Sequence, residues 1–296
     1  MLYEAANAKI NLFLDVTGRR PDGYHELHSC MQTVDLCDTV SAEILPAKET
    51  SIRLTCSDGA LPADSRNLAY RAAELFLTEQ RITDCDLRLH VEKRIPLSAG
   101  LGGGSADAAA VLRLLNRYYD SPLTVPQLCE LGAKLGADVP FCVTGGTCRC
   151  EGVGEVLTPV SCLPDYSVVV AKDGEGVSTP LAFSLLDEKY GDFTAYEPAD
   201  PFAIYAALSG GDVRALSHSI FNIFEDVIFP IRPRARQIRD FLLTHGAVCA
   251  QMSGSGPSVF GIFLSDARAS VCAAELRRQG IFAAACRTIA DSMKQE

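Results

Sequence analysis

The sequence predicts an α+β fold organised as two domains. At 296 residues the chain is long enough for about two domains and can bury a full core. Alternating apolar residues over 87–91 indicate a strand, which a glycine-rich loop joins to a helical pattern. The segment 247–288 is patterned as strand, turn, strand, helix and strand, which is typical of an α+β module with an antiparallel sheet. The pattern changes near 150–165, so we expect an N-terminal domain at 1–160 and a C-terminal domain at 161–296.

The first strand predicts a hairpin. Apolar residues occupy the even positions from 10 to 16, while Lys9 and Asn11 lie on the opposite, polar face. Residues of this type on a polar face are usually solvated. The segment 18–23 contains Pro-Asp-Gly, which is strong turn chemistry, so Tyr24 and His25 are expected to begin the returning strand.

The glycine loop is the main indication of chemistry. It lies in PLSAGLGGGSADAAAVL (96–112), where glycines at 100, 102, 103 and 104 permit φ > 0 and a close approach by another group. Ser105 is the predicted N-cap of the following helix, with Asp107 in its first turn, where a negative charge suits the helix dipole. A strand, a glycine loop and a helix N-terminus in this order build an anion site. The loop lacks the P-loop lysine and the dinucleotide spacing, so a tight connection whose glycines serve only packing is the alternative.

Two further features bear on chemistry. SGSGPS (253–258) is a second glycine loop between strands, and a simple hairpin turn is its alternative interpretation. Asp138 is a carboxylate among apolar residues and beside Pro140. A residue in such a place is more often a helix cap or a paired structural group than a catalytic one.

The composition excludes several classes of protein. The net charge is −10, and the basic cluster at 231–239 is interrupted by proline and by Ala235, so we expect no nucleic-acid partner. The twelve cysteines lie mostly in apolar stretches without metal-ligand spacing, which indicates reduced thiols of a cytoplasmic protein. No targeting segment and no apolar run of membrane-spanning length is present, so no membrane partner is expected.

Several motifs together resemble a known family. They occur in the order AKINLFLDVTGRRPDGYHELHS (8–29), PLSAGLGGGSADAA (96–109), LGADVPF (135–141), EGVGE (151–155) and MSGSGPSVF (252–260). This set resembles the GHMP kinase superfamily. Within it, Asn-Leu-Phe-Leu followed by Pro-Asp-Gly-Tyr-His resembles the branch that acts on a cytidine diphosphate-linked methylerythritol in the non-mevalonate isoprenoid precursor pathway.

The resemblance implies a fold and a reaction. The fold would be the two-domain GHMP kinase fold, with a ribosomal protein S5 domain 2-like N-terminal domain and a ferredoxin-like C-terminal domain. The reaction would transfer the γ-phosphoryl group of ATP to the 2-hydroxyl of the methylerythritol unit, with Mg²⁺. A monomer or a weak homodimer is expected.

Two alternatives stay open. One is a GHMP-type kinase for another small alcohol, such as homoserine or mevalonate, against which the Pro-Asp-Gly-Tyr-His stretch argues. The other is a non-catalytic nucleotide-binding protein on the same fold. The loss of Lys9 or Asp138 would be its signature, and both residues are present.

The resemblance also assigns roles to residues. Asp138 is similar to the general base of the family, and Lys9 to the cation beside it. The substrate positions are matched by Tyr24 and Phe183, a pair of rings around cytosine, by His25, which would read the base edge, and by Asn11 near the sugar-alcohol. The ATP positions are matched by Asn67 and Lys93 near the adenine and by the loop residues Pro96, Leu97, Ser98, Ala99, Gly100, Leu101, Gly102, Gly103, Gly104, Ser105 and Ala106.

One departure from the family pattern concerns the metal. Many members carry Gly-Leu-Gly-Ser-Ser, in which a serine hydroxyl helps to hold Mg²⁺. Here Gly103 and Gly104 occupy the serine positions, so Ser105 or bridging waters are the alternatives for the metal.

Overall fold

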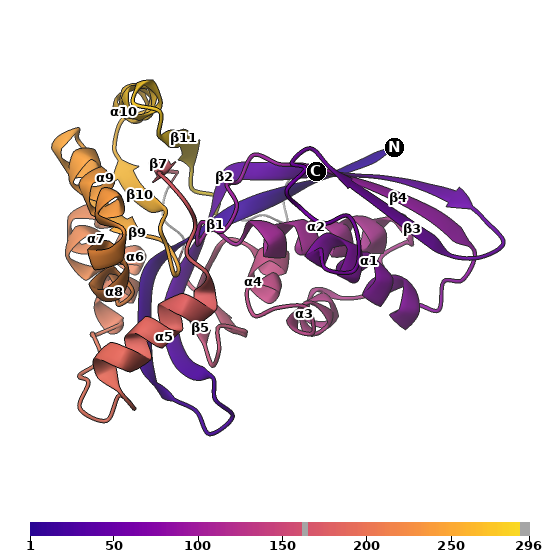
Figure 1. The fold of residues 1–296 in the computed structure, drawn as a ribbon, viewed down its shortest axis with the longest axis horizontal. Coiled ribbons are helices and arrows are strands. Elements are labelled where there is room, and N and C mark those ends of the chain that lie inside the picture. The colour runs from indigo at the N-terminus through magenta and orange to yellow at the C-terminus, as the bar shows by residue number, and fades with distance from the viewer. Residues whose placement is uncertain (162–164, 291–296) are drawn as a thin grey trace. The chain divides into compact units, whose positions relative to one another are not determined.

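The structure, a computed structural model, describes residues 1–161 and 165–290, with its elements labelled in Figure 1. It divides the chain into two compact units that interleave along the sequence. Unit 1 holds residues 1–8, 37–95 and 102–144, and unit 2 holds residues 9–36, 96–101 and those from Gly145 onward. Strands β1 (Leu2–Arg19) and β2 (His25–Pro46) contribute residues to both units. The division into contiguous domains at residue 160 stays a prediction.

Unit 1 is a sheet covered by helices. The second part of β2 pairs antiparallel with β4 (Cys85–Glu92), and β4 pairs parallel with β3 (Ser51–Cys56). Leu87, Leu89 and Val91 of β4 are buried, as the alternation predicts. The helices of this unit are α1 (Leu68–Glu79), α2 (Gly103–Tyr118), α3 (Val125–Ala133) and α4 (Val139–Thr144). Figure 1 shows α1 and α2 side by side, and their apolar faces share one buried core with the strands.

The start of α2 differs from the prediction. Ser105 is not the N-cap, because the helix begins two residues earlier and Gly102 is its N-cap, with φ of 69°. The carbonyl of Gly102 accepts the first bond of the helix from the Ala106 N–H at 2.8 Å. Glycine adopts this left-handed conformation without steric cost. The glycine run therefore enters the helix before a serine is reached, and Ser105 has helical geometry.

Unit 2 contains the predicted hairpin. β1 and β2 are neighbours in one sheet, and the turn between them contains Gly23 with φ of 87°. The short strand β8 (Phe221–Asn222) pairs parallel with β1. β5 (Thr147–Glu151) pairs antiparallel with β2 and with β6 (Val156–Pro159).

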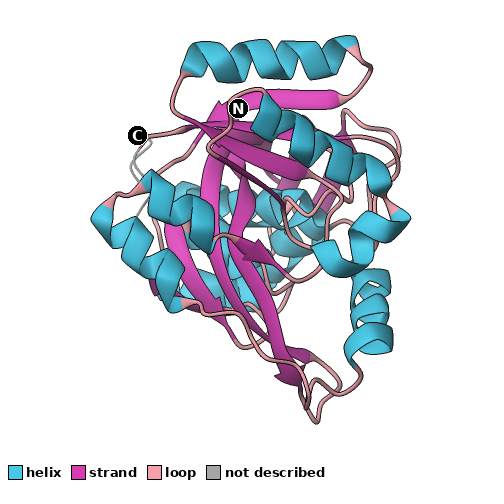
Figure 2. Cartoon of the chain, turned by 90° about the vertical axis from the view of Figure 1, so that its left-hand side faces the viewer, coloured by secondary structure: helices cyan, strands magenta, loops and turns pink. Residues whose placement is uncertain are grey.

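A second sheet in unit 2 is antiparallel. It comprises β7 (Ser167–Lys172), β9 (Cys249–Met252), β10 (Val259–Phe263) and β11 (Phe282–Arg287), in the order β11-β7-β10-β9. Its helices are α5 (Thr179–Tyr190), α6 (Phe202–Gly210), α7 (Val213–Ser219), α8 (Glu225–Ile231), α9 (Pro233–Thr244) and α10 (Asp266–Arg278). The succession of strand, helices, two strands, helix and strand is the expected ferredoxin-like arrangement. Figure 2 shows how helices, in cyan, and strands, in magenta, both contribute to the α+β fold.

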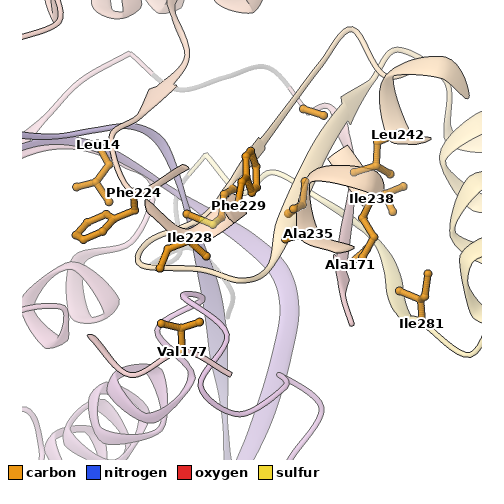
Figure 3. Close-up of a cluster of buried hydrophobic side chains, with 14 of the residues drawn as sticks. Leu14, Ala171, Val177, Phe224, Ile228, Phe229, Ala235, Ile238, Leu242 and Ile281 are labelled. Atoms are coloured by element: carbon orange, nitrogen blue, oxygen red, sulfur yellow. The ribbon is translucent and has the colours of Figure 1, made fainter. Parts of the chain in front are cut away.

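The core of unit 2 packs helices against this sheet. Figure 3 shows Ile238 and Leu242 one turn apart on α9, with Ala171 of β7 among their neighbours in the same buried cluster. Phe224, the N-cap of α8, and Ile228, within that helix, belong to the same cluster. Burying a large apolar side chain contributes about 1.5–3 kcal/mol, so this cluster holds the strands and loops of the unit in place.

The helices of the described ranges, 1–161 and 165–290, include none with the length and hydropathy to cross a membrane.

A buried ion cluster fixes the start of α2 within unit 1. The ammonium of Lys93 donates to Oδ2 of Asp107 at 2.6 Å and to Oδ2 of Asp38, and all three side chains are almost fully buried. Oδ1 of Asp38 accepts from the backbone N–H groups of Arg94 at 2.5 Å and Ile95 at 2.8 Å. The prediction that Asp107 lies in the first turn and interacts with the helix dipole was therefore wrong. This residue lies further into the helix and forms a buried ion pair.

Burial raises the pKa of Asp107 to about 7, and Lys93 opposes this rise while Asp38 adds to it. The folded protein therefore holds a proton on Asp107 more tightly than the unfolded chain does, for which the carboxyl pKa is about 3.9. The resulting stabilisation is fully present below about pH 4 and is lost as the pH rises toward 7.

Asp107→Asn, which has no proton to lose, should therefore change stability in a pH-dependent way. We expect the free energy of unfolding of the variant, relative to the parent protein, to increase by about 2–3 kcal/mol between pH 5 and pH 7.5. Chemical denaturation at several pH values measures this difference. Asp64→Asn is the matched control, since the pKa of Asp64 is lowered to about 2 by Arg66, and its difference should stay constant over this range. A constant difference for Asp107→Asn would contradict the prediction.

Candidate functional site

The first part of the glycine loop packs against the second glycine loop, within unit 2. A Cβ atom on Gly100, whose φ is +74°, would lie 2.1 Å from the carbonyl oxygen of Ser253. Oγ of Ser253 donates to the Gly100 carbonyl at 2.9 Å, and the Ser258 N–H donates to the Ala99 carbonyl at 3.3 Å. Gly100 is therefore required by the approach of another backbone. The segment 253–258 joins two antiparallel strands, as a hairpin connection does, and also forms this contact.

A third loop reaches the same place. A Cβ atom on Gly176 would lie 2.4 Å from the Cβ atom of Ser98, which has a φ of 47°. The hydroxyls of Thr179 and Ser255 are 3.3 Å apart. The three segments 96–101, 173–179 and 253–258 thus pack on one another through backbone and small side chains. Gly176 was not identified from the sequence, because a single glycine in a polar loop carries no distinguishing pattern.

The second part of the glycine loop opens α2 in unit 1. No side chain caps this helix, whose N-cap Gly102 has none. A Cβ atom on Gly103 would lie 3.1 Å from Cγ2 of Ile95 and 3.6 Å from Nζ of Lys93. The first-turn N–H groups of a helix have no intrahelical partner, and the helix dipole makes this end positive. An uncapped N-terminus of this kind can bind a phosphate group.

Lys9 and Asn11 form part of a buried polar row in unit 2. Their side chains are almost fully buried, so the expectation that they are solvated was wrong. The ammonium of Lys9 donates to Oδ1 of Asn11 at 2.7 Å, and Nδ2 of Asn11 donates to Oγ of Ser29 at 2.9 Å. Ser29 in turn donates to the Phe13 carbonyl at 2.8 Å. The Lys9 N–H donates to the Leu101 carbonyl at 3.0 Å, which ties β1 to the glycine loop.

The residues predicted around cytosine all lie in unit 2. Tyr24, on the hairpin turn, has 64% of its surface exposed. His25 is buried and stacks on Phe183, with ring centroids 4.6 Å apart and planes at 21°. Its Nε2 lies 2.6 Å from Oδ1 of Asp187, and its ring edge meets Phe193. The structure thus brings His25 and Phe183 together and leaves the Tyr24 ring available to a planar ligand.

Asp187 is a residue that the sequence analysis missed. It lies four residues after Phe183 on α5, so the two side chains share one face of that helix. Arg19 also approaches it, with NH1 3.9 Å from Oδ2. The spacing of a carboxylate and an aromatic residue on one helix was visible in the sequence, but its pairing with His25 spans 162 positions.

The remaining predicted residues lie in unit 1. Asp138 is partly exposed in the turn before α4, and its carbonyl accepts from the Cys142 N–H at 3.1 Å. Asn67 caps α1, because its Oδ1 accepts from the Ala69 N–H at 2.9 Å. Lys93 belongs to the buried ion cluster. Asn67 and Lys93 therefore have structural roles here, and their contacts with a nucleotide stay predictions.

The donor set for Mg²⁺ is sparse. No group of three or more His, Cys, Asp or Glu side chains that could hold a metal ion occurs among the residues the structure describes. Gly103 and Gly104 offer no hydroxyl, and Ser105 lies within the first turn of α2.

Comparisons with known proteins agree with this fold. The family model for the GHMP kinases N terminal domain matches residues 67–146, and the model for the GHMP kinases C terminal domain matches residues 203–281. A 4-diphosphocytidyl-2-C-methyl-D-erythritol kinase from Exiguobacterium sibiricum is 44% identical over 264 residues, which cover 89% of this chain and 90% of the relative.

Solved structures give the same result. A crystal structure of 4-(cytidine 5'-diphospho)-2C-methyl-D-erythritol kinase matches with a TM-score of 0.81 and 35% identity, covering 97% of this chain and 99% of the other. A homoserine kinase from Cytophaga hutchinsonii matches with a TM-score of 0.73 and 18% identity, covering 98% of this chain and 94% of the other, and shows the shared fold alone. The two family models and the high identity over most of the chain lead to one conclusion. The chain belongs to the GHMP kinase family.

Proposed function

We propose that this protein is a kinase that transfers the γ-phosphoryl group of ATP to the 2-hydroxyl of 4-diphosphocytidyl-2-C-methyl-D-erythritol. The observation that carries the proposal is the identity over most of the chain with a relative of that name. The glycine loop before an uncapped helix and the aromatic residues of unit 2 support it chemically.

The proposed nucleotide site is the loop 96–106. Phosphoryl transfer has a loose transition state with charge spread over the transferred oxygens, so positioning and electrostatics dominate catalysis. The N–H groups at the start of α2 are fixed by the helix and need no reorganisation as that charge develops. Mg²⁺ enters the proposal as the counter-ion of the ATP phosphates, since it commonly keeps several waters and phosphate oxygens as ligands.

The proposed general base is Asp138. The acceptor is a tertiary alcohol, which gives up its proton only as its oxygen bonds to the γ-phosphorus. That bond forms while the bond from the γ-phosphorus to the bridging oxygen of ADP breaks, and the Asp138 carboxylate receives the proton. We assign Lys9 to the neutralisation of negative charge at the reacting group, and Asn11, its hydrogen-bond partner, to the sugar-alcohol.

The proposed cytidine site uses the ring of Tyr24 as a stacking face. The stacked pair of His25 and Phe183 would form its other side, with Asp187 orienting the His25 ring. A base that stacks on an aromatic side chain gains about 1–3 kcal/mol, which explains why a kinase for a small polyol recognises a nucleobase. A cytoplasmic monomer or weak homodimer, without a nucleic-acid or membrane partner, is part of the same proposal.

Asp138→Asn tests the base. We expect turnover to fall by about 10²–10⁴-fold, because the amide cannot take the proton, while the affinity for a non-hydrolysable ATP analogue changes little. Steady-state kinetics and calorimetric titration measure the two quantities. Asp120→Asn is the control, a like change in the exposed turn after α2. Full turnover in Asp138→Asn would show that another group receives the proton.

Tyr24→Ala tests the cytidine site. Loss of a stacking face worth about 1–3 kcal/mol should raise KM for the cytidyl substrate by about 5–150-fold and leave KM for ATP unchanged. The exposed Tyr118, in unit 1, provides the control variant Tyr118→Ala. An equal rise in both KM values would place the cytosine site elsewhere.

Ligand-dependent thermal unfolding separates the proposal from a kinase for homoserine or mevalonate. A ligand at one hundred times its Kd stabilises a protein by about 2.7 kcal/mol. We therefore expect CDP to raise Tm, and homoserine and mevalonate to leave it unchanged. Stabilisation by homoserine or mevalonate, with none by CDP, would favour the other kinases.

A further inference from the structure

The side chain of Asn222 is hydrogen-bonded to the backbone at the start of the second glycine loop. Asn222 ends the short strand β8 and is almost fully buried. Its Nδ2 donates to the carbonyls of Met252 at 2.8 Å and Gly254 at 2.9 Å. Its Oδ1 accepts from the Phe224 N–H at 3.0 Å. Both donors and the acceptor of this amide are therefore used on backbone groups.

A neighbouring carboxylate completes the attachment. Oε1 of Glu225 accepts from the Met252 N–H at 2.8 Å, and its Oε2 accepts from NH1 of Arg239 at 2.9 Å. The backbone of Met252 is thus held at its N–H by Glu225 and at its carbonyl by Asn222. Asn222 lies on β8, which pairs with β1. The position of the loop after Met252 is therefore tied to these two strands, β8 and β1.

The residue after Met252 transmits this position to the first glycine loop. Oγ of Ser253 donates to the Gly100 carbonyl at 2.9 Å and accepts from the Asn11 N–H at 3.3 Å. The Ser253 carbonyl occupies the space that a Gly100 side chain would need, and a Cβ atom on Gly254 would lie 2.8 Å from the Gly100 carbonyl. A shift of the 253–256 loop therefore cannot leave Gly100 in place.

We propose that Asn222 is a positioning residue for the nucleotide loop, acting through Ser253 on Gly100. The proposal rests on the proposed function in taking the ligand of that loop to be ATP. Asn222 is buried next to the 253–256 loop, and all the hydrogen bonds of its side-chain amide are made with backbone groups of unit 2. Its effect on the ligand passes through the backbone of the two glycine loops.

Asn222→Asp is the sharpest variant, because it changes two donors into an oxygen of the same shape. A carboxylate oxygen at this place would face two carbonyl oxygens at hydrogen-bond distance, which is repulsive. Ser253→Ala is the second variant. It keeps the Asn222 contacts and removes the hydroxyl that joins the two loops, which also accepts from the Asn11 N–H.

Asn116→Asp is the matched control. Asn116 is also buried, and its amide donates to the Leu123 carbonyl at 2.9 Å and accepts from the Leu123 N–H at 3.0 Å. This residue lies near the far end of α2 in unit 1. The same chemical change there disturbs a buried amide without touching the two glycine loops.

The experiment measures the Kd of a non-hydrolysable ATP analogue by calorimetry, below the Tm of every variant, together with KM for ATP and for the cytidyl alcohol. We expect Kd and KM for ATP to rise about tenfold in Asn222→Asp and about threefold in Ser253→Ala. KM for the cytidyl alcohol should change less than twofold in Asn222→Asp, and Asn116→Asp should lower Tm alone.

Two results would overturn the proposal. One is an unchanged Kd in both variants, and the other is an equal rise of both KM values in Asn222→Asp. If Asn222→Asp fails to fold, the Kd of the ATP analogue in Ser253→Ala decides. The titration does not depend on turnover. A protein that binds the analogue without phosphorylating the cytidyl alcohol would therefore refute the proposed function. The role of Asn222 would then be judged by the Kd of the analogue alone.

Discussion

The contact between two backbones at Gly100 is the constraint on which the candidate site depends. A carbonyl oxygen of the 253–258 loop lies where any side chain at position 100 would begin. The two loops are about 150 residues apart in the chain and are joined by the hydroxyl of Ser253. Asn222 and Glu225 hold one side of this contact, and the bond from Lys9 to the Leu101 carbonyl holds the other. The first part of the glycine loop is therefore packed between the 253–258 loop and β1.

A packed loop suits the electrostatics of phosphoryl transfer. Backbone N–H groups stabilise developing charge most effectively when they are already oriented, because no energy is then spent on turning them. The buried ion cluster fixes the start of α2 within unit 1. Lys93 joins the end of β4 to α2 through Asp107 and to β2 through Asp38. The helix that would receive the phosphate is thereby fixed near its first turn. The positive charge of Lys93 is thus compensated by two carboxylates of the same unit, Asp38 and Asp107.

Local patterns in the sequence predicted local structure well, and pairings between distant residues poorly. The alternation in β4, the hairpin after β1 and the strand, loop and helix order around the glycines follow from period and turn chemistry. The burial of Lys9 and Asn11 could not be predicted, because alternation normally marks a half-exposed strand and here the polar face is buried through hydrogen bonds that reach Ser29, 18 positions away. The partners of His25 and Asn222 were also invisible, since each lies at the end of a long sequence separation. The family motifs predict which residues form the site, and the fold shows which residues pack around them.

The glycines of the loop serve different purposes, which explains the departure from the family pattern. Gly100 allows the backbone contact and Gly102 adopts the left-handed cap, so neither tolerates a side chain easily. A Cβ atom on Gly103 would need Ile95 to move by a few tenths of an ångström, and it would lie at the ordinary distance of 3.6 Å from Nζ of Lys93. Gly104 differs, because its Cβ position meets only Leu68 at the ordinary distance of 3.6 Å. At position 103 a side chain is therefore opposed by the close approach of Ile95, whereas at position 104 packing alone does not exclude a serine.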